Sequence, residues 1–558
     1  MSVISVLLAC ASAPLTSSVT SVAIPMRDGV RLAADIVRPA HGDPAPTVLV
    51  QARYWRSFAL RVPDPPGEPP VGPDQEVIRS LVAGGYAVVV IDVRGTGASE
   101  GDWRFPWSGD EIADSGEVID WIIAQPWADG RVGTYGVSYG GTAALLAAAN
   151  GRPALRAALA REIEWEPVTE IVAPGGVRNV AFVEAWADAV AALDRGRLAS
   201  FFPFAAQWLA TGPRLLDDDP RGAGLAARLA ARQIADVRGD LAGVRAPSDR
   251  WGAHVEDGIP LRARDVGPAA LVDRLAAAPT AIGVWGSWFD AATAVAVSIA
   301  DTRLPNLVDA RIGAWDHEGT GSASPFAGDH ATVAPADVTA FFDAHLRGTS
   351  ARRFRWFEVG ADVWREGRPE TATQTWTLGA DGTLSEAPPA ALRFVAPIDH
   401  TSGPNNRWTA GLLRPVRPVD ATRAAPGLHT WTTAALTEDL DLRGAPRWAC
   451  PLVTDRTAAV HAYLDALLTN GGVVRLSEGV GRLDEGAGPA DALPLLPIAA
   501  HLPSGSRLRL GVAAADTDTF ERLTDVAPVW SADGCALQVV VGLSATATPR
   551  SASAPTFR

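Results

Sequence analysis

The strongest chemical signal in the chain is a serine at the centre of a glycine-flanked pentapeptide. Gly136-Val137-Ser138-Tyr139-Gly140 fits the pattern G-x-S-x-G, with a strand-like run before it and a helix-like run of small residues after it. This context is typical of a nucleophile elbow, a sharp strand-to-helix turn that presents a serine hydroxyl above an α/β sheet. A glycine-rich turn with a bystander serine is the alternative. We take Ser138 as the candidate nucleophile.

A serine nucleophile needs a histidine base and an acid that orients the histidine. His317 comes shortly after the strand-like run 310–313, and Asp290 comes shortly after the run 281–285, so both fall in loops at strand ends. The resulting chain order of serine, acid and histidine is that of α/β-hydrolases. The sequence therefore predicts that Ser138, Asp290 and His317 act together.

Other residues compete for these two roles. His330 lies in a loop and is the alternative base, whereas His345 falls in a predicted helix and is expected to pack or to face solvent. Asp316 is too close to His317 in sequence to orient it, and Asp301 lies within or after a helix. For Asp290 itself, a helix N-cap is the alternative role.

Alternating strand and helix patterns surround these residues. Strand-like runs occur at 21–26, 32–37, 47–51, 87–92, 131–135, 281–285 and 310–313, and helix-like runs occur at 76–84, 110–124, 139–149 and 335–346. The run 87–92 is continuously apolar, as in a parallel sheet covered on both faces. Short connections between such runs predict a doubly wound α/β sheet.

Two further regions differ from this pattern. Between about 165 and 275 the strand signal fades and helix-like runs occur at 182–193, 201–209 and 224–237, which predicts a helical cap. Beyond 351, short alternating runs at 354–359, 375–378, 428–433, 472–476, 507–513 and 536–541 predict an all-β sandwich or jelly roll. We expect an α/β-hydrolase body at 18–160 and 277–350, the cap at 161–276 and the jelly roll at 351–558.

Composition excludes several kinds of protein. The 558 residues are 47% hydrophobic and 20% charged, an ordinary globular balance, and the net charge of -14 argues against nucleic acid and anionic membranes as partners. The chain contains no lysine, so all 49 basic residues are arginine. This excludes Schiff-base, P-loop and Ser-Lys chemistry and is typical of a GC-rich bacterial genome. Any cationic contact to a substrate must therefore come from arginine.

The cysteines and the N-terminus give weaker signals. Cys10, Cys450 and Cys535 are too few for a disulfide framework or a cysteine-rich metal site, and we expect them to be small buried residues. No apolar run is long enough to span a bilayer. Residues 1–14 suit a frayed start or a first strand of a cytoplasmic protein, although residues 7–10 loosely resemble a lipoprotein cleavage box and leave export as the alternative.

Three motifs together resemble a known family. The pentapeptide around Ser138, the sequence Trp288-Phe289-Asp290 and the spacing Gly313-x-Trp315-x-His317 are similar to those of the cocaine esterase/X-Pro dipeptidyl-peptidase (CocE/NonD, S15-like) serine hydrolases. The resemblance extends from about residue 20 to the end and implies an α/β-hydrolase body with a helical cap and a C-terminal jelly roll. It also implies a Ser138–Asp290–His317 triad, and an oxyanion hole formed by the Tyr139 N–H and the Tyr54 hydroxyl. It calls for no metal and no cofactor.

The substrate is less well defined than the chemistry. We expect a small ester, amide or short peptide, held in an aromatic pocket by Trp165, Trp288 and Trp315. The alternating acids Glu162, Glu164 and Glu166 suit one solvated face better than an anchor for a substrate amine. An esterase or acylase is the main hypothesis. The alternatives are a dipeptidyl-peptidase, aminopeptidase or amino-acid ester hydrolase, and a catalytically dead binding protein. The oligomeric state stays open, a homodimer included.

Overall fold

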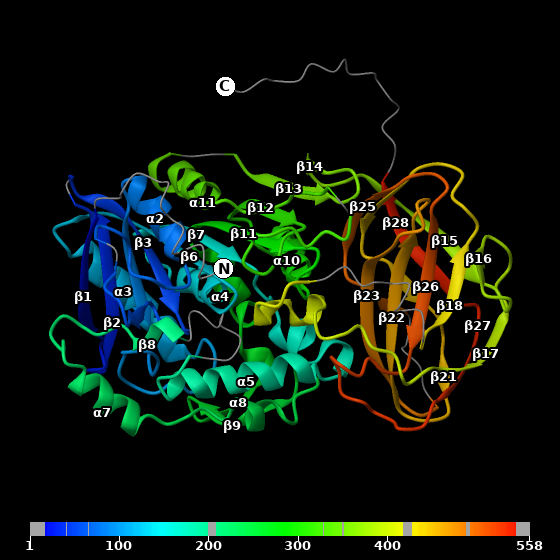
Figure 1. Cartoon of the computed structure of the whole chain (residues 1–558), viewed down its shortest axis with the longest axis horizontal. Helices are drawn as coiled ribbons and strands as arrows, with labels where there is room; N and C mark the ends of the chain where they lie inside the picture. Colours follow the sequence, from blue (N-terminus) through cyan, green and yellow to red (C-terminus); the bar gives the residue numbers. More distant parts are fainter. Residues whose placement is uncertain are drawn as a thin grey trace, which may run out of the picture.

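A computed structural model describes residues 17–40, 42–64, 66–198, 208–326, 328–348, 351–416, 427–486 and 492–542. These residues form an α/β body, a β-rich domain at one end of the molecule, and a cap that lies along the lower side of the body in the view of Figure 1. The predicted fold class, an α/β-hydrolase body followed by an all-β domain, is confirmed. Residues 1–14, including Cys10, lie outside the described part of the chain.

One ten-stranded sheet forms the centre of the body. Its strands follow the order β1-β2-β5-β3-β6-β7-β11-β12-β13-β14, and all pairs from β5 to β13 are parallel. The strands are β1 (Ser17–Pro25), β2 (Arg31–Pro39), β3 (Ala45–Ala52), β5 (Ala87–Asp92), β6 (Ala128–Val137), β7 (Leu155–Arg161), β11 (Ala281–Ser287), β12 (Leu307–Gly313), β13 (Arg353–Glu358) and β14 (Val363–Glu366). Every residue of β5 is buried, as its apolar run predicts.

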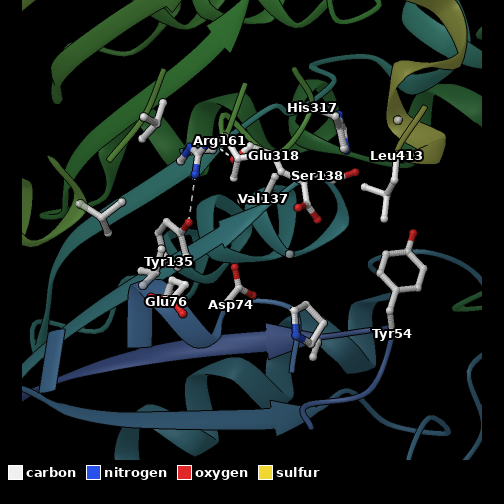
Figure 2. Close-up of a pocket in the computed structure, with 18 of the residues that line it drawn as sticks. Tyr54, Asp74, Glu76, Tyr135, Val137, Ser138, Arg161, His317, Glu318 and Leu413 are labelled. Carbon is white, nitrogen blue, oxygen red and sulfur yellow. Dashed lines mark hydrogen bonds between the residues drawn. The ribbon is translucent and has the colours of Figure 1, made fainter. Parts of the chain in front are cut away.

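Helices of the body pack against this sheet and against one another. They are α2 (Gln75–Ala83), α3 (Gly109–Ile123), α4 (Tyr139–Leu146), α9 (Val272–Ala277), α10 (Thr293–Arg303) and α11 (Pro335–Phe342). Helix α4 contacts β3, β6 and β7, and seven of its eight residues are buried, which explains its run of small residues. The loops after β3, β6 and β12 and the last residue of β7 meet around one cavity (Figure 2).

The cap between β7 and β11 mixes helices with short strands. Its elements are α5 (Val180–Asp194), β8 (Ala210–Pro213), α7 (Ala223–Ala231), α8 (Val237–Leu241), β9 (Arg250–Glu256) and β10 (Ile259–Arg262). Strand β8 pairs with β4 (Phe58–Leu60) of the body, and β9 pairs with β10. The prediction of a purely helical insertion was therefore too simple. The predicted helix 182–193 corresponds to α5, and most of 201–209 lies outside the described residues. The predicted helix 224–237 is too long: α7 ends at Ala231, and α8 begins only at Val237.

The C-terminal region consists mainly of antiparallel strands. They are β15 (Thr371–Leu378), β16 (Thr383–Ser385), β17 (Ala391–Val395), β18 (His429–Thr433), β19 (Leu440–Gly444), β20 (Arg447–Ala449), β21 (Val453–Thr454), β22 (Ala458–Leu467), β23 (Val473–Leu483), β24 (Leu493–Pro494), β25 (Ile498–Leu502), β26 (Arg507–Ala513), β27 (Val529–Asp533) and β28 (Ala536–Gly542). They form an eleven-stranded and a three-stranded sheet. The run 354–359, predicted to belong here, instead forms β13 and pairs with β12 of the body.

A short buried helix, η7 (Arg407–Leu412), connects this C-terminal domain to the rest of the molecule. The Arg407 guanidinium donates to the Trp288 carbonyl at 3.1 Å, and the Ala291 N–H donates to the Arg407 carbonyl at 2.9 Å. In the cap, the Asn179 amide donates to the Trp408 carbonyl at 3.1 Å. The C-terminal domain is thus bonded to the loop that carries Asp290.

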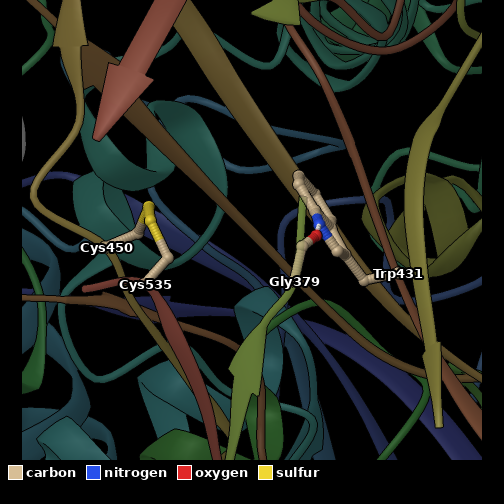
Figure 3. Close-up of a disulfide and its surroundings, with 4 residues drawn as sticks. All are labelled: Gly379, Trp431, Cys450 and Cys535. Atoms are coloured by element: carbon tan, nitrogen blue, oxygen red, sulfur yellow. Dashed lines mark hydrogen bonds between the residues drawn. A yellow bond between two sulfur atoms is a disulfide. The ribbon is translucent and has the colours of Figure 1, made fainter. Parts of the chain in front are cut away.

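Cys450 and Cys535 were predicted to be buried residues that do not pair with each other, and the prediction about pairing was wrong. They form a disulfide between β20 and β28 across a sequence separation of 85 residues (Figure 3). Both residues are buried, as predicted. Closing a long loop in this way restricts the unfolded chain and stabilises the fold by about 2–4 kcal/mol.

None of the helices in the described residues combines the length and the apolar character that a bilayer crossing requires.

Candidate active site

The turn between β6 and α4 holds Ser138 in an unusual backbone conformation. Its φ is 59° and its ψ is -123°, a region that non-glycine residues rarely adopt. An added Cβ at Gly136 would lie 2.2 Å from the Gly140 carbonyl carbon, so the turn can close only with glycine there. The strand, tight turn and helix expected of a nucleophile elbow are all present, and Ser138 lines the cavity.

His317 and Asp290 lie together at the same edge of the sheet. The His317 Nδ1 atom is 2.7 Å from Asp290 Oδ2, and both side chains are buried. Because Nδ1 is bonded to the acid, Nε2 is the nitrogen left for Ser138. Ser138 and His317 line the same cavity, where Figure 2 shows their side chains beside each other. The structure therefore brings the three predicted residues to one place.

The competing residues lie elsewhere. His330 is exposed, and His345 is half-buried against the Phe341 ring; neither lines the cavity. Asp301 lies near the end of α10 and is bound by Arg352 and Arg368. Asp316 accepts from the Thr320 N–H at 2.8 Å and so shapes the loop that carries His317.

The surroundings of His317 strongly favour its protonated form. Burial alone would lower the pKa of the imidazole, but Asp290, Glu162 and Glu164 outweigh burial and raise that pKa to about 9. Such a value favours an ion pair between His317 and Asp290 at neutral pH in the free protein. A general base must be neutral, so this site is expected to work best at alkaline pH.

Glu162 and Glu164 do not form a solvated face, and that prediction was wrong. Glu162 is 0% exposed and Glu164 is 7% exposed, and only Glu166 is partly accessible. Glu162 accepts from Trp315 Nε1 at 2.6 Å, and burial and Asp290 raise its pKa well above the ordinary range. The chain is irregular after β7, with Glu162 at a φ of 49°, so the alternation in sequence does not become a two-sided strand. None of the three acids lines the cavity.

Tyr54 lies in the loop after β3, across the cavity from His317 (Figure 2). Its hydroxyl accepts a hydrogen bond of 2.9 Å from Trp186 Nε1 of α5. Burial raises the pKa of this phenol to about 12, so it keeps its proton. With the acceptor position taken by Trp186, the Tyr54 O–H proton is available for a second group in the cavity.

Hydrogen bonds of Tyr139 hold the turn in place. Its hydroxyl donates to Glu111 Oε2 at 2.6 Å and accepts from Trp103 Nε1 at 2.9 Å. The Trp107 indole N–H also donates to the Tyr139 carbonyl at 3.1 Å. These bonds fix the first residue of α4, whose backbone N–H is the second expected oxyanion donor.

The cavity has a volume of about 520 Å³ and is lined by residues from all three regions of the chain. Trp186 of the cap and Leu413 of the C-terminal domain both border it. Gly411 packs against His317, since an added Cβ there would lie 3.6 Å from the imidazole Cε1. Sequence reasoning missed these residues because they are distant in sequence and belong to no motif.

The three tryptophans predicted to line the pocket do not do so. Trp165, Trp288 and Trp315 are buried, and none borders the cavity. Two of the three indole N–H groups have internal acceptors: Trp288 Nε1 donates to the Phe357 carbonyl at 2.8 Å, and Trp315 Nε1 donates to Glu162. They therefore support the catalytic loops from the core and do not contact substrate.

One arm of the cavity is polar. Arg161, Tyr135, Asp74 and the loop residue Glu318 border it, with Glu76 towards its rim (Figure 2). None of these residues belongs to a recognisable sequence motif. Among the described residues, no group of three or more His, Cys, Asp or Glu side chains is arranged to hold a metal ion.

Comparisons with known proteins agree with this architecture. A family model described as X-Pro dipeptidyl-peptidase (S15 family) matches residues 28–219, and one described as X-Pro dipeptidyl-peptidase C-terminal non-catalytic domain matches residues 354–528. A protein of Mycobacterium bovis named for a serine esterase activity is 29% identical over 581 residues, covering 90% of this chain and 91% of the relative. The cocaine esterase of a Rhodococcus species is 30% identical over 399 residues, covering 66% of this chain and 63% of that enzyme.

Solved structures give the same fold at lower sequence identity. An aminopeptidase from a marine-sediment archaeon (Thaumarchaeota) has a TM-score of 0.71 at 19% identity, covering 95% of this chain and 97% of its own. An α-amino acid ester hydrolase has a TM-score of 0.70 at 18% identity, covering 96% of this chain and 98% of its own. At these identities the likeness concerns the fold alone.

Proposed function

The chain belongs to the cocaine esterase/X-Pro dipeptidyl-peptidase family of serine hydrolases, and we propose that it cleaves ester or amide bonds of small acyl substrates through Ser138, His317 and Asp290. The observation that carries the triad is the 2.7 Å contact between His317 Nδ1 and Asp290 Oδ2, beside a serine in a strained turn that borders the same cavity. No other histidine of the described residues borders this cavity.

In the proposed first half-reaction, neutral His317 takes the Ser138 proton through Nε2 as the serine oxygen attacks the substrate carbonyl. Asp290 holds the imidazole by Nδ1 and stabilises the cation that forms. The Tyr54 O–H and the Tyr139 N–H donate to the developing oxyanion, and each such donor is worth about 3–4 kcal/mol in the transition state. His317 then protonates the leaving group, which leaves an acyl-enzyme on Ser138.

Water completes the cycle in the second half-reaction. His317 removes a proton from water, which attacks the acyl carbonyl, and the same two donors stabilise the second oxyanion. His317 then returns a proton to Ser138 as the acid is released. Every step uses groups of this chain and water.

The test compares unaltered protein with Ser138→Ala and with Ser298→Ala, an exposed serine of α10. We expect the unaltered protein and Ser298→Ala to hydrolyse short p-nitrophenyl esters and to react with a fluorophosphonate probe. Ser138→Ala should lose the probe reaction and nearly all hydrolysis while unfolding at the same temperature. A folded, unaltered protein that neither hydrolyses the esters nor reacts with the probe would favour the binding-protein alternative.

A peptidase activity is the second candidate, because the family model over residues 28–219 is named for an X-Pro dipeptidyl-peptidase. Two acids, Asp74 and Glu76, border the cavity and could hold a substrate amine. An X-Pro p-nitroanilide separates the two candidates. Cleavage of the anilide at a rate comparable with that of the ester supports the peptidase, and cleavage of the ester alone supports the esterase.

A further inference from the structure

The polar arm of the cavity has the features of a substrate subsite. Resting on the function proposed above, we propose that Arg161, Tyr135 and Asp74 bind a secondary amide in the acyl part of the substrate, with the amide oxygen facing Arg161 and Tyr135 and the amide N–H facing Asp74. The preferred acyl groups are then of the N-acylamino or peptide kind, and simple aliphatic acyl groups are poorer substrates.

Arg161 lies beside the nucleophile. Arg161 is the last residue of β7 and pairs with Val137 of β6. Its carbonyl accepts from the Ser138 N–H at 2.8 Å, so the two residues are neighbours across the sheet edge. Its side chain is only 2% exposed overall and yet borders the cavity.

The hydrogen-bonding capacity of the Arg161 guanidinium is only partly used. Nη1 donates to the Tyr135 hydroxyl at 3.1 Å and Nη2 donates to the Glu318 carbonyl at 2.9 Å, but the buried Nε–H has no acceptor. Arg161 forms no ion pair within the part of the chain that the structure describes. Asp74 and Glu162 attract this buried cation without forming an ion pair with it. A guanidinium has five N–H donors, so Arg161 can donate to a further group.

The loop that contains Gly319 leaves room for the Arg161 guanidinium. Gly319 has a φ of 75°, and an added Cβ there would lie 2.2 Å from Arg161 Nη2. Any other residue at 319 would displace the guanidinium or the loop that carries His317. The geometry of the loop thus holds Arg161 in the cavity wall.

Hydrogen-bond donors and an acceptor border the same part of the cavity. Tyr135 accepts from Arg161, so its own O–H proton is free to donate. Asp74 precedes α2, and its side chain does not cap that helix. Burial and Glu318 raise the pKa of Asp74 to about 6 while Arg161 opposes them, so the carboxylate is mostly ionised at neutral pH and can accept.

The charges around the arm favour a neutral group over an anion. Arg161 is one cation, whereas three acids, Asp74, Glu76 and Glu318, border the arm. A substrate carboxylate would gain from Arg161 but would be repelled by these acids. A secondary amide offers an acceptor to the guanidinium and a donor to Asp74 without adding charge.

The arm suits the acyl part because of where His317 lies. His317 must protonate the leaving group, so the leaving group occupies the side of Ser138 that faces the imidazole. In Figure 2, His317 and Leu413 lie on one side of Ser138, and Arg161, Tyr135 and Asp74 lie on the other. The acyl chain therefore extends towards the polar arm.

The test uses p-nitrophenyl esters of matched length whose acyl chain carries a secondary amide, methylenes in its place, or a terminal carboxylate, with the amide placed at several positions along the chain. For the best-placed amide, we expect the unaltered enzyme to favour the amide ester over the methylene ester roughly 10- to 100-fold in kcat/KM, the range of a hydrogen bond to a charged group. Arg161→Met should bring this ratio close to one.

Two further variants serve as controls: one in case Arg161→Met fails to fold, and one for the general effect of removing an arginine. Tyr135→Phe removes one hydroxyl and should lower the ratio several-fold if Arg161→Met fails to fold. Arg152→Met removes a surface arginine that pairs with Asp120 and should leave the ratio unchanged. Equal hydrolysis of all the esters, an unchanged ratio in folded Arg161→Met, or a preference for the carboxylate would each overturn the amide subsite. If the unaltered enzyme hydrolyses none of the esters and Ser138 does not react with the fluorophosphonate, the proposed function itself fails.

Discussion

The cavity edge and the interior of the C-terminal domain both bury charged side chains, but they treat them differently. In the C-terminal domain, Asp465 is 0% exposed and is bound by Arg475 at 3.0 Å and Arg509 at 2.8 Å. At the cavity edge, Arg161 has no ion pair among the described residues, and Glu162 is bonded only to uncharged donors.

This difference distinguishes buried ionisable side chains that stabilise the fold from those that can take part in binding or catalysis. A buried charge that is fully paired has no capacity left for a ligand, and removing its partner mainly destabilises the fold. Buried charges without a counterion shift the pKa values of their neighbours, as Glu162 and Glu164 do for His317. Substitutions in the two regions should therefore separate activity from stability.

The largest effect on activity is expected from Asp290→Asn. Without the carboxylate the His317 imidazole loses its orientation and the stabilisation of its cation, so kcat/KM for a p-nitrophenyl ester should fall about 10⁴-fold. Asp301→Asn is the matched control, because Asp301 is a buried acid of the same body that is paired with Arg352 and Arg368. Equal losses of kcat/KM in the two variants would remove the distinction between acids that take part in the reaction and acids that only stabilise the fold.

The opposite result is expected from Asp465→Asn. This change leaves Arg475 and Arg509 buried without their carboxylate, and the free energy of unfolding should fall by about 3–5 kcal/mol, measured by chemical denaturation. The kcat/KM of the molecules that remain folded should stay the same. Asp120→Asn, which breaks an exposed pair with Arg152, should change stability much less. A loss of activity without a loss of stability would contradict the structural role of Asp465.

The smallest effect concerns the pH profile. The active form has neutral His317, so kcat/KM should rise with pH through a pKa well above the ordinary histidine value, near 9. Glu164 has a pKa raised to about 7 and is ionised in that range, where its charge favours the imidazolium. Glu164→Gln should move the rising limb to lower pH by up to about one unit. Glu166→Gln, two residues away and bonded to Thr169, should not move it.

Local patterns were enough to predict much of the fold and the proposed triad. Ser138 belongs to a short motif, and His317 and Asp290 follow runs that had to be parallel strands, so topology brings them to one edge. Arg161, Trp186 and Leu413 could not be found this way, because three regions of the chain contribute them through tertiary packing. The disulfide between Cys450 and Cys535 joins residues 85 positions apart, and sequence alone does not give such a pairing.

The predictions that tryptophans line the pocket and that glutamates form a solvated face failed for the same physical reason. Tryptophan and glutamate were interpreted from their usual locations, a pocket wall and a solvated face. Here Trp315 donates its N–H to Glu162 inside the core, so each residue satisfies the other's polar group. An interaction of this kind becomes visible only once the loops after β7 and β12 are seen side by side.

The most direct test of the account is to trap the acyl-enzyme and to locate its mass. The protein is mixed with a slowly hydrolysed p-nitrophenyl ester, quenched in acid, digested and examined by mass spectrometry. The account predicts one added acyl group, on the peptide that contains Ser138, and none in Ser138→Ala. An acyl group on another residue, with Ser138 unmodified while the ester is being turned over, would contradict it.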